Sequence, residues 1–147
     1  MMRKVCKATF AGMLCLLFSC TIAPEEINYG VDACSFCKMT IVDQQHAAQY
    51  VTEKGKQFKF DAIECMVNDI AEKGTQDIGI LLVADYEQPG VLTDAINANY
   101  LISEAIKSPM GANLSGFAAA EAALAVQEEY GGELFTWETL LKKFEAE

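Results

Sequence analysis

The sequence predicts a single α+β domain in which two repeated ββαβ units form antiparallel or mixed sheets. Strand signals flank a helical signal in the first unit, and the second unit repeats that order. Landmark residues of the two units are related by one shared offset of 57 residues, which is typical of an internal duplication. The pairs are Phe60 and Phe117, Glu64 and Glu121, and Gly74 and Gly131. We therefore place the two halves at about 29–90 and 91–147.

Four segments of the first half have the composition of strands. Residues 40–42 are a β-branched run. Residues 47–52 and 57–60 lie on either side of a polar turn that contains Gly55, so we expect a hairpin. Residues 77–86 contain a run of apolar residues that is typical of a buried strand.

A helix is predicted between the hairpin and the buried strand. Asp61, followed three residues later by Glu64, predicts an N-cap with a capping box, and Gly74 after Lys73 predicts the helix end. Apolar residues at helical spacing predict its core face, namely Ile63, Met66, Val67 and Ile70. Cys65 falls on the opposite, polar side at about 100° per residue, so we expect a partly exposed thiol there.

The second half shows the same succession of signals. Residues 96–102 and 110–117 are expected to be strands, and residues 118–130 have the apolar spacing of an amphipathic helix. A final strand is expected at residues 134–137, followed by a terminal helix.

Composition limits the classes of function. The chain has 147 residues, 52% of them apolar, which suits one compact domain and excludes a disordered protein. Its formal charge is −10, with only 11 cations, and this argues against binding to nucleic acid. Motifs of common catalytic sites, such as a nucleophile elbow or a Walker loop, do not occur in the sequence. We therefore expect a protein that is not an enzyme.

The N-terminus has the pattern of a secretory signal. Three cations precede an apolar run in residues 1–19, and the run is shorter than the ~20 residues that span a bilayer. The residues that end at Cys20 resemble a bacterial lipobox, which predicts lipidation of Cys20 after cleavage. Residues 20–28 then form a polar tether, and residues 29–147 the domain. Cleavage removes cations only, so the formal charge falls from −10 to −13.

Three thiols remain in the domain, at Cys34, Cys37 and Cys65. An odd number suits metal chemistry better than a disulfide scaffold. Cys37 and Met39 are two residues apart, so in an extended chain both side chains point the same way and could share one Cu(I), an ion that soft sulfur ligands select. Cys34 lies outside that register, as a third ligand, a resolving thiol or a bystander.

Two further residues are candidate ligands from the rest of the chain. Met110 lies in a turn between Pro109 and Gly111, where a core methionine is unexpected, so a Cu(I) site of Cys37, Met39 and Met110 would bridge the halves. His46 is the single histidine and is a possible auxiliary ligand, as are Cys34 and Cys65.

Other chemistries of the Cys34/Cys37 pair remain open. A structural zinc site needs four ligands, typically with a second closely spaced Cys/His pair. The sequence offers only the single residues Cys65 and His46 and no second CxxC, so zinc is disfavoured. A thioredoxin-like pair would begin a helix, whereas residues 40–42 predict a strand. A plain disulfide between the two cysteines is the structural alternative.

Three motifs together resemble the NosL family of nitrous oxide reductase accessory lipoproteins. They are the segments 32–39, with Cys34, Cys37 and Met39, 60–66, with Asp61 and Cys65, and 109–112, with Met110. The resemblance implies a pair of ββαβ units and a Cu(I) chaperone whose ligands carry over onto Cys37, Met39 and Met110. Lys38 stands where the family usually has glycine.

The resemblance also implies a place and partners. It implies a lipid-anchored protein on the periplasmic or cell-surface face of a bacterial membrane, with the outer membrane expected. Apo nitrous oxide reductase and a membrane ABC transporter complex are the implied partners. The alternative function is a membrane-tethered thiol-disulfide protein that uses Cys34 and Cys37.

Overall fold

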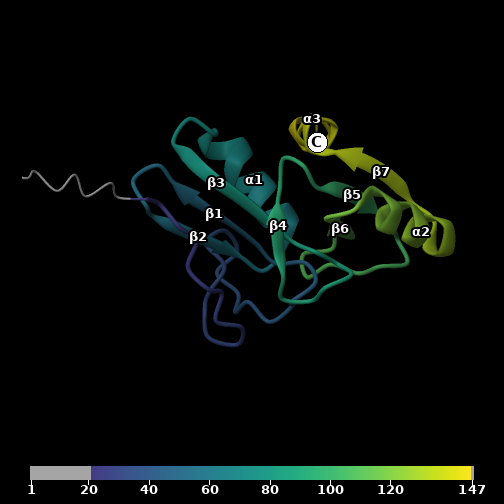
Figure 1. The fold of residues 1–147 in the computed structure, drawn as a ribbon, viewed down its shortest axis with the longest axis horizontal. Coiled ribbons are helices and arrows are strands. Elements are labelled where there is room, and N and C mark those ends of the chain that lie inside the picture. The colour runs from purple at the N-terminus through teal and green to yellow at the C-terminus, as the bar shows by residue number, and fades with distance from the viewer. Residues whose placement is uncertain (1–20, 147) are drawn as a thin grey trace, which may run out of the picture.

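The computed structural model describes residues 21–146, so the predicted signal peptide and Cys20 lie outside the described residues. Seven strands and three helices follow one another in this range. They are β1 (Ala48–Thr52), β2 (Gln57–Phe60), α1 (Ile63–Lys73), β3 (Ile78–Ala84), β4 (Leu92–Asp94), β5 (Asn99–Ile102), β6 (Leu114–Phe117), α2 (Ala120–Tyr130), β7 (Glu133–Thr136) and α3 (Trp137–Glu145). In Figure 1, β1–β4 fill one side of the molecule, and β5–β7 with α2 and α3 fill the other.

The two sheets confirm the predicted α+β class and its repeated units. The first sheet has the order β2-β1-β3-β4 and the second the order β6-β5-β7, with every pair antiparallel. In each unit, the first strand therefore lies between the second and the third. β2 and β6, and α1 and α2, are related at both ends by the predicted offset of 57 residues. β4 is an extra strand, and it joins the first sheet.

One predicted strand is wrong. Residues 40–42 form no strand, and the segment has a single isolated bridge between Ala33 and Thr40. Ile41 donates its backbone N–H to Asp32 and accepts from Gly30, so the chain closes a loop on itself. The Ile41 side chain is fully buried. The β-branched signal therefore reflects packing of a loop onto the core rather than a place in a sheet.

Helix α1 occupies the centre of the molecule. It contacts β1 and β2 of its own unit and also β6 and α3 of the other unit. Seven of its 11 residues are buried, whereas α2 buries only Ala123 and Val126. The main hydrophobic core accordingly includes residues of both halves, such as Met66 and Leu140. The second half thus packs onto the helix of the first.

The start of the described chain is fixed to the first sheet. The Gln57 side chain donates to the backbone oxygen of Ala23 and accepts from the backbone N–H of Glu25, and Lys59 donates to the backbone oxygen of Glu26. Ile27 is buried in the core. Residues 23–27 of the predicted tether are thus part of the folded domain. Within residues 21–146, each helix is too short or too polar to cross a lipid bilayer.

Candidate metal centre

The two predicted cysteines lie on a tight loop before β1. The backbone N–H of Cys34 donates to Met39 O at 2.7 Å, and that of Lys38 donates to Cys34 O at 3.1 Å. Lys38 has a φ of 69°, a left-handed conformation that favours glycine. Ser35 ties the loop to β2, because it donates its N–H to Lys59 O and accepts the Lys59 N–H on its hydroxyl.

Asp61 reaches the same place from the end of β2. The predicted N-cap at Asp61 is wrong: the N-cap is Ala62, which makes no side-chain cap hydrogen bond. The Asp61 carboxylate instead turns toward the cysteine loop and accepts a hydrogen bond from Cys37 Sγ at 3.4 Å. The capping box partner Glu64 is also engaged elsewhere, since it accepts from Ser108.

Cys65 completes the cluster from the first turn of α1. The expectation that its thiol is partly exposed is wrong, since Cys65 is 1% exposed. The reason is that the loop of Cys34 and Cys37, together with Asp61, lies against the Cys65 side of α1. Asp61 precedes the helix and Cys65 lies in its first turn, so helical spacing does not relate the two residues.

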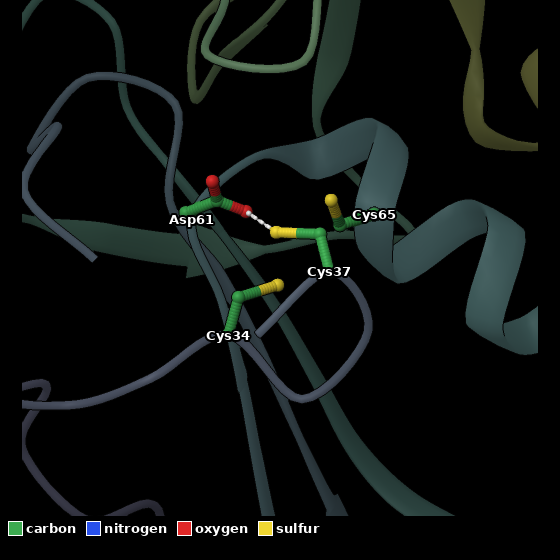
Figure 2. Close-up of side chains that lie close together, drawn as sticks. All are labelled: Cys34, Cys37, Asp61 and Cys65. Atoms are coloured by element: carbon green, nitrogen blue, oxygen red, sulfur yellow. Dashed lines mark hydrogen bonds between the residues drawn. The ribbon is translucent and has the colours of Figure 1, made fainter. Parts of the chain in front are cut away.

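Figure 2 shows the side chains of Cys34, Cys37, Asp61 and Cys65 pointing toward one another. One ligand atom from each of the four lies within 4.8 Å of every other. Cys34 is 1% and Asp61 2% exposed, whereas Cys37 is partly exposed and forms the accessible side. All three cysteines are free thiols. Three sulfurs and one carboxylate oxygen thus lie around one small volume, and of the four residues only Cys37 is partly exposed.

The local electrostatics favour one thiolate among the three cysteines. A hydrogen bond from the Cys65 thiol, helped by the backbone amides of Asp61 and Cys37, lowers the pKa of Cys34 to about 6 against the effect of burial. Burial raises the pKa of Cys37 to about 11, and the neighbouring Cys34 and Asp61 add to the rise. The hydrogen bond to Cys34 and burial also raise the pKa of Cys65. Cys34 is therefore the thiol of the site that ionises at neutral pH.

The two methionines predicted as ligands lie at the surface. Met39 is 55% exposed and Met110 is 45% exposed. Glu64 anchors the loop of Met110 to the first turn of α1, because its Oε1 accepts from Ser108 Oγ and from the Ala112 N–H at 3.3 Å. The loop that carries Met110 is therefore attached to Glu64, the residue before Cys65 in α1. The sequence predicted Glu64 only as a capping-box residue.

His46 has a different environment from the one expected for an auxiliary ligand. Its Nδ1 lies 2.9 Å from Asp43 Oδ2 and its Nε2 lies 3.2 Å from Ser115 Oγ. The ring is buried and also packs edge-on against Tyr86. Among the described residues, the cluster that could hold a metal does not include His46. The histidine links the two halves.

The domain is an α+β fold in which three free thiols and a carboxylate lie close enough to hold a metal ion. The NosL family matches residues 26–144, so the chain belongs to the NosL family. The chain is similar in structure to the copper chaperone NosL from Shewanella denitrificans, with a TM-score of 0.70 and 18% sequence identity. That match covers 80% of this chain and 95% of the other. No curated protein sequence matches the chain.

Proposed function

We propose that this chain is a copper chaperone that binds Cu(I) and passes it to a partner protein. The observation that carries the proposal is the convergence of three free thiols in one site with a single accessible edge at Cys37. Thiolate and thioether ligands select Cu(I) over harder ions. The NosL neighbour from Shewanella denitrificans, named as a copper chaperone, supports the same function.

The arrangement suits an ion that must be released as well as bound. Cys34 and Cys65 are buried, so they would hold copper away from water, whereas the partly exposed Cys37 would meet the thiol or thioether of a partner. Met39 and Met110 are exposed soft donors on the neighbouring loops, and we assign them to capture and transfer. Copper is the cargo in this scheme, and the chain carries out no catalytic step.

The remaining parts of the proposal concern place and partners. We propose that lipidated Cys20 anchors the domain to the periplasmic or cell-surface face of a bacterial membrane, expected to be the outer membrane. The recipient is apo nitrous oxide reductase, with a membrane ABC transporter complex as the second partner. Mass spectrometry of the mature N-terminus tests the anchor, and an unmodified Cys20 would refute it.

The alternative of a thiol-disulfide protein fits the thiols less well. Exchange requires a thiolate that a partner disulfide can reach. The thiol with the lowered pKa, Cys34, is buried, and the accessible thiol, Cys37, has a raised pKa. The cysteine pair also lies in a turn rather than at the start of a helix. This geometry favours metal binding.

Anaerobic competition for Cu(I) between the reduced full chain and a chromophoric chelator tests the proposal. We expect one Cu(I) per chain, with binding weakened at least tenfold by Cys37→Ser or Cys65→Ser and weakened less by Met110→Leu. Asp77→Asn alters an exposed acidic residue and serves as the control. Failure of the reduced wild-type chain to take Cu(I) from the chelator would refute the proposal.

A further inference from the structure

The carboxylate of Asp61 is surplus to a copper site. Cu(I) is satisfied by two or three soft sulfur ligands, and Cys34, Cys37 and Cys65 supply three. Yet Asp61 is 2% exposed and its Oδ1 faces the sulfurs, where it accepts from Cys37 Sγ (Figure 2). A hard oxygen donor buried among thiols points to an ion of intermediate character.

The distances in the cluster suit a four-coordinate ion. In a tetrahedral zinc site, Zn–S bonds of about 2.3 Å and a Zn–O bond of about 2.0–2.2 Å put two sulfurs about 3.8 Å apart and a sulfur about 3.5 Å from the oxygen. The separation of Cys37 Sγ and Asp61 Oδ1 is 3.4 Å. All four donor atoms lie within 4.8 Å of one another, so small side-chain movements would close them around one ion.

We propose that the cluster also binds Zn²⁺, with Cys34, Cys37, Cys65 and Asp61 as its four ligands, and that Asp61 distinguishes zinc from copper. The sequence contains no second closely spaced Cys/His pair, and for this reason zinc was disfavoured. Folding brings Asp61 and Cys65 to the cysteine pair and completes a set of four ligands. This inference goes beyond the copper function and does not depend on it.

Zinc held by four protein ligands would form a closed site with no open coordination position. Three of the four ligands are buried, so the ion would enter and leave past Cys37. Bound zinc would keep the three thiols from forming disulfides until a softer ion with a higher affinity for thiolates replaces it. Exchange of one metal for the other requires no electron transfer.

The test compares Zn²⁺ and Cu(I) binding by the same variants. The reduced, metal-free full chain is titrated with Zn²⁺ against a chromophoric zinc chelator and, separately, with Cu(I) against a copper chelator. We expect one Zn²⁺ per chain. Asp61→Asn should weaken zinc binding about tenfold or more and should affect Cu(I) binding far less than it affects zinc binding, whereas Cys65→Ser should weaken both. Asp77→Asn makes the same charge change at an exposed site and should alter neither.

X-ray absorption of the zinc-loaded wild-type chain provides a measurement that needs no variant. We expect three sulfur neighbours at about 2.3 Å and one oxygen neighbour at about 2.0–2.2 Å. Absence of zinc binding, or zinc binding that Asp61→Asn leaves unchanged, would overturn the proposal. So would an equal loss of zinc and copper binding in Asp61→Asn. A chain that binds zinc but no Cu(I) would refute the copper function and leave this inference standing.

Discussion

Glu64 is expected to hold the two halves together at the metal centre, and its replacement by alanine tests this directly. Glu64 is buried on α1, and its Oε1 accepts from Ser108 Oγ and the Ala112 N–H. Glu64→Ala removes the acceptor for both donors while keeping a good helix former at the position. The loop that carries Met110 then loses its attachment to α1.

The expected loss of stability can be worked from these contacts. The Ser108 hydroxyl is buried, whereas the Ala112 N–H is only part-buried. A buried donor left without its partner costs about 1–3 kcal/mol, so the two together cost at most about 2–6 kcal/mol. Part of this is offset, because Glu64 Oε2 is itself buried without a partner among the described residues, and its removal relieves about 1–3 kcal/mol. The net loss is about 2 kcal/mol, which lowers Tm by about 6–10 °C in a domain of this size.

Thermal and urea unfolding of the reduced, metal-free full chain measure this loss. The matched control is Glu121→Ala, because Glu121 holds the equivalent position on α2, 57 residues later, and is exposed. We expect the control to change stability by less than about 0.5 kcal/mol. Cu(I) affinity provides a second readout: Glu64→Ala should weaken it as Met110→Leu does, and the double variant should be no weaker. If Glu64→Ala is as stable as Glu121→Ala, the anchoring role is wrong.

Three further outcomes follow from the site. The pKa of Cys34 falls from 9.0 to about 6 on folding, so the free energy of unfolding should rise as pH increases from about 6 to 9. The pKa of Cys37 rises to about 11, so the free energy of unfolding should fall from about pH 9 to 11. Urea unfolding across this pH range should show both changes, and Cys34→Ser should abolish the rise. His46→Ala should cost about 1–3 kcal/mol by freeing Asp43 and Ser115, with Cu(I) affinity unchanged in the chelator assay. Lys38→Gly removes the strain of a left-handed backbone conformation, which costs about 1–2 kcal/mol at a residue other than glycine. The greater backbone entropy of glycine in the unfolded chain offsets about 0.5–1 kcal/mol of this gain, so we expect a small rise in Tm. A fall in Tm would contradict this expectation.

Patterns with a short period predicted most of the fold. The alternation in residues 57–60 and the apolar spacing of residues 63–70 predicted β2 and α1, because each depends on one face being buried against a neighbour in the same unit. The offset of 57 residues predicted the repeat in the same way, since equal spacing gives equal elements. The strand predicted from the β-branched residues 40–42 was wrong, because a loop residue such as Ile41 can fill the core without joining a sheet.

The metal centre divides between what the sequence determines and what folding decides. Cys34 and Cys37 are only three residues apart in the sequence, so a role for the two as a pair was visible there. Asp61 and Cys65 were assigned to a helix cap and a polar face, which are the local roles of their residue types. Only the packing of the cysteine loop against the end of β2 and the start of α1 buries both residues and places them beside Cys34 and Cys37. Local patterns encode which side of an element is apolar, whereas the burial of its other side depends on contacts between residues far apart in the chain.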